Sequence, residues 1–162
     1  MATDPTASAP RPLADGIEIR EARLDEVEEL LPLMRAYCDF YEASPPDAGL
    51  REMARALITD PDQGFFLIAV EAEVAVGFAT VHWKWSSLRG ARIGYLEDIF
   101  VAPEARGRGI ADGLIEASAE RCRERGMPAM EWLTAPDNHR AQAVYDRTGA
   151  VRKTFVEYDL KL

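Results

Sequence analysis

An arginine- and glycine-rich turn near the middle of the chain has the residue types that bind phosphate groups. The turn reads ARGRGIA over residues 105–111 and follows an apolar run, residues 95–101, that we expect to form a buried strand. Its glycines allow positive φ angles, and a helix that begins near Gly109 would add free N–H groups and a positive dipole end. With Arg106 and Arg108 as cationic flanks, the turn can hold a diphosphate. The alternative is a simple chain reversal with two solvated arginines.

The glycine spacing excludes two common nucleotide-binding loops. Gly107, Gly109 and Gly113 form Gly-x-Gly-x-x-x-Gly, which is one residue longer than the dinucleotide fingerprint. The nucleoside triphosphate loop needs Gly-Lys-Ser/Thr, but no lysine lies between Lys84 and Lys153. The pattern that the turn does fit is Arg-x-x-Gly-x-Ala.

Two further side chains, Asn138 and Tyr145, lie in a helix that we expect over residues 138–148. Their separation of seven positions is about two helical turns, so both project from one face of that helix. Each also has an ordinary structural role open to it. Asn138 stands where a helix N-cap is expected, and Tyr145 shares an apolar face with Ala141 and Val144.

Two adjacent carboxylates, Glu97 and Asp98, interrupt the apolar strand at residues 95–101. Neighbouring strand residues point to opposite faces, so we expect only one of the two to face a site. A carboxylate there can position a cationic amine or accept its proton, directly or through water. The alternative is that one of them only pairs with a nearby arginine.

Strands and helices of both kinds would position these residues. The expected strands are residues 17–20, 65–70, 74–85, 95–101, 130–134 and 151–160. The expected helices are residues 24–41 with a bend or break at Pro32, 50–59, 109–125 and 138–148. The helix at 109–125 is a crossover that places the strands on either side of it next to each other and parallel. The chain is therefore α/β (α+β), with a mixed, mostly antiparallel central sheet of six to seven strands flanked by about four helices. Ligands of such sheets bind at the strand C-termini beside the crossover loop.

Length and composition indicate one globular domain. The 162 residues are 48% hydrophobic and 29% charged, which is ordinary for a globular protein. Residues 1–15 are rich in small polar residues and proline and are expected to be a disordered tail, followed by a single domain over residues 16–162. Cys38 and Cys122 fall within expected amphipathic helices, so we expect reduced core thiols and no bound metal.

The charge of the chain restricts its partners. The formal net charge is −9, from 28 acidic and 19 basic residues, which disfavours nucleic acid and anionic membranes and favours a cationic substrate. No apolar run approaches the ~20 residues of a membrane span, and no basic segment followed by an apolar one begins the chain. We therefore expect a cytoplasmic protein.

The turn and the following helix resemble a known family. Arg-x-x-Gly-x-Ala resembles the acyl-CoA signature of the GNAT acyltransferase superfamily, Gln/Arg-x-x-Gly-x-Gly/Ala, and LTAPDNHRAQAVYDRTGA resembles its second motif. The order of expected elements also matches the GNAT fold. The resemblance implies acetyl-CoA as the cofactor, with Asn138 on the CoA arm and Tyr145 as the acid that protonates the departing thiolate. The implied CoA site consists of Phe100, Val101, Arg106, Gly107, Arg108, Gly109, Ile110, Ala111, Asn138 and Tyr145.

Residues 77–115 resemble one branch of that superfamily, the spermidine/spermine N-acetyltransferases. The branch has the tract Tyr-Leu/Ile-Glu-Asp-Phe/Ile-Phe/Tyr-Val, and YLEDIFV is similar to it. The resemblance implies that Glu97 meets the amine as a catalytic group and that Asp98 is its acidic neighbour. Further implied substrate contacts are Trp83, Trp85, Tyr41 and Glu42. The chain departs from the branch at Pro136-Asp137, where the branch has Trp before the Asn, and at Asp112, which adds a negative charge near the diphosphate.

The sequence thus predicts an acetyl-CoA dependent N-acetyltransferase. The expected reaction is direct attack of a primary amine of a small cationic substrate, a polyamine or a basic amino acid, in a ternary complex. An aminoglycoside or a protein N-terminus is an alternative acceptor, and a non-catalytic acyl-CoA binding module is an alternative of another class. Analogy with GNAT proteins also predicts a homodimer, with TFVEYDL at residues 154–160 as a possible pairing edge.

Overall fold

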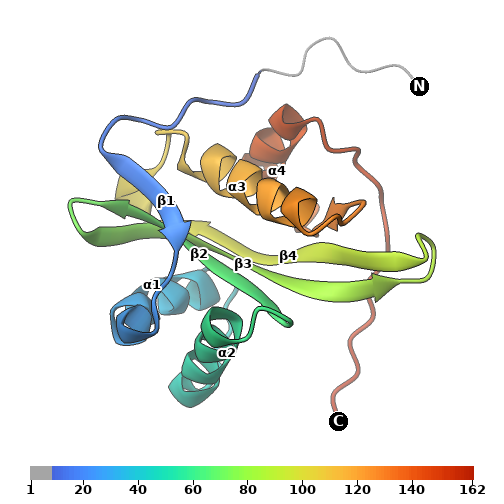
Figure 1. Ribbon diagram of the computed structural model, residues 1–162, viewed down its shortest axis with the longest axis horizontal. Coiled ribbons are helices and arrows are strands. Elements are labelled where there is room, and N and C mark those ends of the chain that lie inside the picture. Colours follow the sequence, from blue (N-terminus) through green and yellow to red (C-terminus); the bar gives the residue numbers. More distant parts are fainter. Residues whose placement is uncertain (1–8) are drawn as a thin grey trace.

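The computed structural model describes residues 9–162 as one five-stranded sheet covered by helices on both faces (Figure 1). The sheet order is β1-β2-β3-β4-β5, and every neighbouring pair is antiparallel except β4 and β5. The strands are β1 (Ile17–Glu21), β2 (Gly64–Glu71), β3 (Val74–Ser86), β4 (Ala91–Val101) and β5 (Met130–Glu131). The helices are α1 (Val27–Phe40), α2 (Asp47–Thr59), α3 (Ile110–Glu124) and α4 (His139–Tyr145), with 3₁₀ turns η1 (Leu24–Glu26), η2 (Pro103–Ala105) and η3 (Asp146–Thr148).

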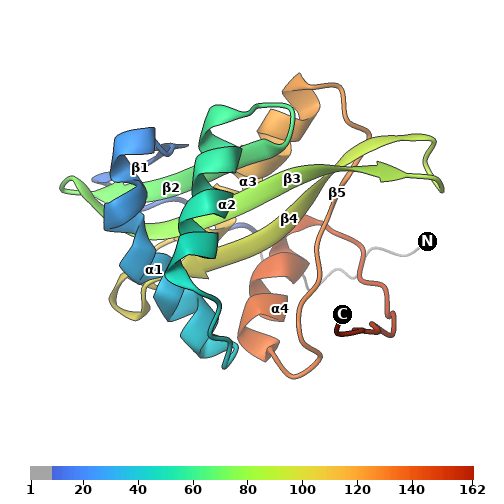
Figure 2. The same cartoon turned by 90° about the horizontal axis from the view of Figure 1, so that it is seen from below.

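The two sides of the central strands build two separate cores. Helices α1 and α2 cover one face of the sheet, and α3 and α4 cover the other (Figures 1 and 2). In β2, Phe66 and Ile68 pack with α1 and α2, whereas Phe65 and Leu67 pack with the α3 side. Alternate residues of a strand point to opposite faces, so a strand between two helical layers must be apolar throughout. This accounts for the uninterrupted run FFLIAV.

The predicted crossover is confirmed. Helix α3 connects β4 to β5, and these strands pair in parallel through Gly94 with Met130 and Tyr95 with Glu131. The ladder ends there, so residues 96–101 of β4 have no strand partner on the β5 side. The chain thus leaves an opening beside the C-terminal end of β4.

The prediction of a strand at residues 151–160, and with it a count of six to seven strands, is wrong for this chain. Beyond Gly149 the backbone has no regular secondary structure and does not join the sheet (Figure 2). The apolar residues of this segment, including Phe155 and Tyr158, remain exposed, because the backbone has no partner strand among residues 9–162. Similarly, the strand expected at residues 130–134 is only two residues long. Pro32 lies inside α1 without ending it.

The segment before β1 contacts the predicted phosphate turn. Of the predicted tail, residues 1–8 lie outside the described residues. Residues 9–15 have no regular secondary structure, but the N–H of Ala14 donates to the carbonyl oxygen of Arg108 at 3.0 Å.

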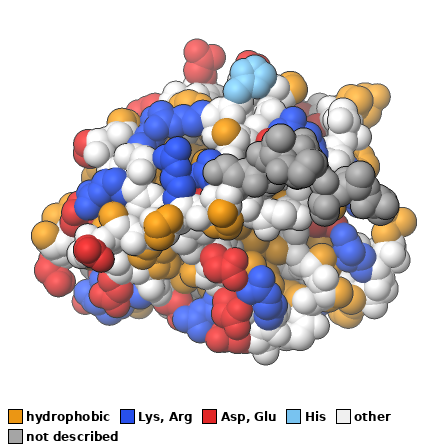
Figure 3. All heavy atoms as spheres, turned by 90° about the horizontal axis from the view of Figure 1, so that it is seen from above, with side chains coloured by type: hydrophobic (Ala, Val, Ile, Leu, Met, Phe, Trp, Pro, Cys, Tyr) orange, Lys and Arg blue, Asp and Glu red, His pale blue; other side chains and the backbone are white. Residues whose placement is uncertain are grey.

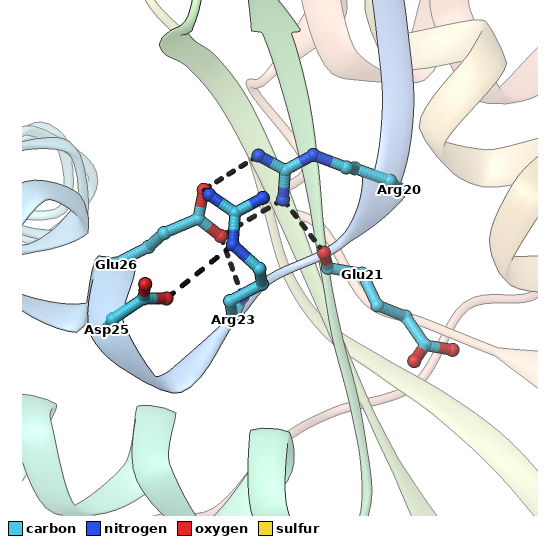
Figure 4. A network of polar contacts seen from close by, with 5 residues as sticks. All are labelled: Arg20, Glu21, Arg23, Asp25 and Glu26. Atoms are coloured by element: carbon cyan, nitrogen blue, oxygen red, sulfur yellow. Dashed lines mark hydrogen bonds and ion pairs between the residues drawn. The ribbon is translucent and has the colours of Figure 1, made fainter.

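A charged network closes the junction between β1 and α1 (Figure 4). Arg20 donates two hydrogen bonds to the carboxylate of Glu26, at 2.7 and 3.0 Å, and Arg23 pairs with Glu26 and with the exposed Asp25. The side chain of Glu26 is only 12% exposed. The hydrogen bond from Arg20 therefore lowers the pKa of Glu26 even though burial opposes the change.

We expect Glu26→Gln to lower the free energy of unfolding by about 1–2 kcal/mol at neutral pH, because a charge-assisted pair is lost at a partly buried site. A lowered folded-state pKa stabilises the fold above the unfolded pKa of the carboxyl group, and this contribution is lost as pH falls through the folded value. The difference between the two proteins should therefore shrink in acid. Urea denaturation at pH 7 and pH 3 measures it, with Asp25→Asn as the exposed control. An equal loss at both pH values would contradict the assignment.

Candidate active site

A groove of about 410 Å³ lies at the C-terminal end of β4. Its walls are the last turn of α1, the end of β4, the turn before α3 and the length of α4. The groove occupies the place where β4 has lost its β5 partner, so backbone groups of β4 border it. A smaller hollow adjoins the groove and shares Tyr37, Tyr41, Ile99 and Tyr145 with it.

The arginine- and glycine-rich turn forms one end of the groove. Gly107 and Gly109 have φ angles of 81° and 77°, which is the left-handed region that favours glycine. Helix α3 begins directly after Gly109, and no side chain caps its N-terminus. The first N–H groups of an uncapped helix attract anions. The turn therefore has the free donors that a diphosphate requires.

The two arginines of the turn have different surroundings. Arg106 lines the groove, and its Nε donates to the carbonyl oxygen of Val101 at 2.9 Å. Burial, together with the nearby charge of Arg140, lowers the pKa of Arg106. Arg108 does not line the groove, because its guanidinium donates to Glu71 on β2 at 2.7 Å. Arg11, Arg140 and Arg147 line the groove with Arg106, and Arg147 is paired with Asp112.

The residues predicted from the second motif both border the groove. Asn138 caps α4, where its Oδ1 accepts a hydrogen bond from the N–H of Ala141 at 3.1 Å, so it has the expected structural role and also lines the groove. Tyr145 ends α4 and contacts Trp132 edge to face, with ring centroids 5.5 Å apart. Burial raises the pKa of Tyr145 to about 12, so its hydroxyl keeps its proton near neutral pH.

A bulge in β4 places both predicted carboxylates on one face of the sheet, contrary to the alternation expected of a regular strand. Thr80 pairs with Asp98 and Val81 with Leu96, which leaves Glu97 without a partner in the β3–β4 ladder. Glu97 lines the small hollow with Tyr145, and its Oε2 lies 3.8 Å from His82 Nδ1. Burial and the charge of Asp98 raise the pKa of Glu97, although His82 opposes the shift.

Asp98 is buried on the same face of the sheet as Glu97, the face that α1 covers, because Thr80 and His82 lie two positions apart on β3. It is 9% exposed, and its Oδ2 accepts a hydrogen bond from the Thr80 hydroxyl at 2.7 Å. It does not line either cavity. The charge of Asp98 adds to burial in raising the pKa of Tyr37, which faces the groove from α1. The structure therefore places Asp98 behind the wall of the groove.

The other predicted substrate contacts are divided. Tyr41 lines both cavities, but Glu42 is exposed just beyond α1 and lines neither. Trp83 is 7% exposed, and its indole N–H donates to the carbonyl oxygen of Pro61 at 2.9 Å, so it belongs to the core. Trp85 is 76% exposed near the end of β3 and lines neither cavity.

Several residues that line the groove or the hollow were not predicted from the sequence, among them Tyr37, Trp132 and Arg140. Tyr37 lies one helical turn before Tyr41, and this i, i+4 spacing could have indicated it. Trp132 lines the hollow from a position inside the expected strand at residues 130–134. For Arg140, no signal in the sequence distinguished it from a solvated arginine.

The chain matches the family model described as the Acetyltransferase (GNAT) family over residues 30–150. This chain belongs to the GNAT family. The match spans the groove walls from α1 to α4, and the mixed sheet with helices on both faces is the GNAT fold. The protein is accordingly an acetyltransferase that uses acetyl-CoA.

Relatives of this GNAT protein differ in substrate. The chain is 28% identical to the uncharacterized N-acetyltransferase YhfO of Bacillus subtilis, over 90% of this chain and 98% of YhfO. It is 30% identical to the D-amino-acid N-acetyltransferase HPA3 of Saccharomyces cerevisiae, over 82% and 84%. It is 29% identical to the thialysine N-epsilon-acetyltransferase of Bos taurus, over 87% and 88%.

Among solved structures, this GNAT chain is similar to the aminoglycoside N-acetyltransferase AAC(6')-Iy in complex with CoA. The TM-score is 0.79 at 25% identity, and the match covers 95% of this chain and 99% of that one. The groove of the present chain suits CoA on its own features: an uncapped helix N-terminus, a turn with left-handed glycines, and arginines at the same end.

Residues 9–162 hold no cluster of three or more His, Cys, Asp or Glu side chains arranged for a metal ion. Within the same residues, no helix has the length and apolar character needed to cross a membrane.

Proposed function

We propose that this GNAT protein acetylates a primary amine of a small cationic substrate, such as a polyamine or a basic amino acid, by direct attack of the amine. The observation that carries the proposal is Glu97, which the β4 bulge turns into the hollow that continues the groove. A half-exposed carboxylate with a raised pKa can receive an ammonium group and accept its proton. Tyr145 lines the same hollow, so an acid and a base border one small space.

Each residue then has a defined task. Acetyl-CoA supplies an acetyl group on a thioester at the end of the groove. Glu97 accepts a proton from the substrate ammonium, which frees the nitrogen lone pair to bond to the acetyl carbon as the carbon–sulfur bond breaks. Tyr145 gives its proton to the departing sulfur, and the protonated phenol that this requires is the form that burial favours. The nitrogen loses its second proton as the amide forms, and this proton restores the Tyr145 phenol. Backbone N–H groups of the turn and Asn138 hold the CoA arm.

The walls of the hollow support a cationic acceptor. Tyr37, Tyr41 and Trp132 surround it together with a single carboxylate. Aromatic faces attract cations, and one carboxylate balances one ammonium group, so the hollow suits the end of a slender amine. A relative that acetylates thialysine supports the same substrate class. An aminoglycoside is a second candidate because the chain is similar to AAC(6')-Iy.

The reaction can be tested by following thiol release from acetyl-CoA with polyamines, lysine-like and D-amino acids, aminoglycosides and short peptides as acceptors. We expect saturable turnover with a small diamine or a basic amino acid. Turnover with aminoglycosides alone would favour the second candidate. Bound acetyl-CoA without turnover on any amine would favour a non-catalytic acyl-CoA binding module, against which the presence of both Glu97 and Tyr145 speaks.

We also propose that the protein forms a homodimer through its C-terminal segment, residues 150–162. Phe155, Val156 and Leu160 are 74–81% exposed there, and exposed apolar residues in a row favour association. We expect light scattering after size exclusion to give twice the chain mass, and the double substitution Phe155→Asp with Leu160→Asp to give the monomer. The control is Leu88→Asp in the β3–β4 hairpin, because Leu88 is fully exposed outside this segment. If the parent protein is a monomer in the same measurement, the homodimer proposal is wrong.

A cytoplasmic location is proposed from the two cysteines. Cys38 and Cys122 are buried and not joined in a disulfide, and burial raises the pKa of Cys122 to about 11, so its thiol is unreactive. Recovery of the protein in a membrane or secreted fraction would contradict this location.

A further inference from the structure

Besides Arg106, Arg140 and the Asp112-paired Arg147, one more arginine lines the CoA groove from outside the matched family region. Arg11, in the segment before β1, lines the groove together with Arg106 and Arg140. Within residues 9–162, none of these three guanidinium groups forms an ion pair with a carboxylate. In a chain of net charge −9, three cations without carboxylate partners at one end of a groove indicate a site for an anion.

The backbone around Arg11 is held against the phosphate turn. The N–H of Arg11 donates to Asp112 Oδ1 at 3.1 Å, and the N–H of Ala14 donates to the carbonyl oxygen of Arg108 at 3.0 Å. Between them, the carbonyl oxygen of Pro12 lies so close to Gly109 that a Cβ on Gly109 would be 2.1 Å from it. The segment therefore crosses directly over the turn, and only glycine at position 109 permits that contact.

Asp112 does not cancel the charge of this site. It is 6% exposed, and its carboxylate accepts hydrogen bonds from Arg147 at 2.8 and 3.1 Å as well as from the Arg11 N–H. Burial alone would raise the pKa of Asp112, but these hydrogen bonds outweigh it and lower the pKa. The carboxylate is therefore ionised and neutralised by Arg147. Its role is to hold the backbone of Arg11 in place, which leaves the Arg11 guanidinium for a ligand.

We propose that Arg11 is a third phosphate-binding arginine of the CoA site, delivered by the segment at residues 9–15. The proposal rests on the use of acetyl-CoA in the proposed function. CoA carries a diphosphate and a separate 3′-phosphate, which is more negative charge than the turn, Arg106 and Arg140 balance. Figure 3 shows one group of Lys and Arg side chains at the upper left of a face that also carries acidic side chains.

The test is the dissociation constant of acetyl-CoA, measured by calorimetry without any amine. We expect Arg11→Ala to weaken binding about tenfold, because one charge-assisted contact to phosphate is lost, and the loss should decrease at high salt. Arg23→Ala is the matched control, since Arg23 lies just beyond β1 and outside the groove, and it should bind as the parent does. Arg11→Lys should retain part of the affinity, because a cation remains without the planar fork.

A second ligand distinguishes the two phosphate sources. The same measurement is repeated with acetyl-CoA that lacks the 3′-phosphate. If Arg11→Ala then no longer changes the dissociation constant, Arg11 binds the 3′-phosphate. If the loss of affinity is as large as before, Arg11 binds the diphosphate, and either result supports the proposal. Equal affinity of parent and Arg11→Ala for acetyl-CoA overturns it, as does tighter binding by the variant, which would mean that the segment obstructs the groove. This measurement contains no amine, so it tests Arg11 even if the protein acetylates none of the proposed substrates.

Discussion

Replacing Tyr145 with phenylalanine is expected to lower kcat by about 10²-fold or more while the dissociation constant of acetyl-CoA stays unchanged. Phenylalanine keeps the ring that packs against Trp132 but removes the only proton that this side chain can give to the departing sulfur. General acid catalysis contributes about 10²–10⁴-fold, which sets the size of the loss. Single-turnover rates and calorimetry separate the two quantities.

The matched control for that variant is Tyr158→Phe. Tyr158 is 92% exposed in the C-terminal segment, so the same loss of a hydroxyl should leave kcat unchanged. The pH profile gives a second check. Because burial raises the pKa of Tyr145 to about 12, ionisation of this phenol should not cause a fall in rate below about pH 10. Parent-like turnover of Tyr145→Phe would show that another group or water supplies the proton.

Glu97→Gln is expected to lower kcat/KM for the amine by about 10²-fold, because the amide has the shape of the carboxylate but neither its charge nor its basicity. Acetyl-CoA binding should not change, since Glu97 lines the small hollow and not the phosphate end of the groove. A rise in KM for the amine with kcat unchanged would indicate that Glu97 only positions the amine. A loss in kcat would indicate that it also accepts the proton.

The pH dependence of the parent protein should identify the same group. The active form of Glu97 is the carboxylate, so the rate falls as pH falls through its pKa, and burial beside Asp98 places that pKa above the ordinary value for Glu. The pH–rate profile of Glu97→Gln should lack this fall in rate at low pH, its acidic limb. Glu131→Gln is the control, because Glu131 pairs with Lys84 and Arg89 outside both cavities. An acidic limb that persists in Glu97→Gln would assign it to another group.

The elements and the family followed from short stretches of sequence. The turn at residues 105–111, the crossover helix and the pair Asn138 and Tyr145 were predicted at the positions where the structure has them. Each depends on local rules: glycine at a positive φ angle, apolar periodicity, and seven positions for two helical turns. Such rules operate within a few residues, so the sequence reveals them without any knowledge of distant contacts.

Which residues line the groove depends on contacts between distant parts of the chain. Arg108 is withdrawn from the groove by Glu71, which lies 37 positions earlier, while Arg11 enters it because Asp112 holds its backbone across 101 positions. No local pattern distinguishes a paired arginine from one without a carboxylate partner. The expected strand at residues 151–160 was wrong for a similar reason, because a strand needs a partner and the described part of the chain provides none there.

The sequence by itself determined the reaction family, the phosphate turn and the candidate acid, since these are written as residue types at fixed spacing. Only the tertiary structure decided which of two adjacent carboxylates can meet an amine. The alternation of a strand predicts that Glu97 and Asp98 point to opposite faces. The bulge in β4 overrides this rule, because Glu97 lies beside His82 and Asp98 beside Thr80, which share one face of β3. Only Glu97 lines the hollow, while Thr80 holds Asp98 in the core.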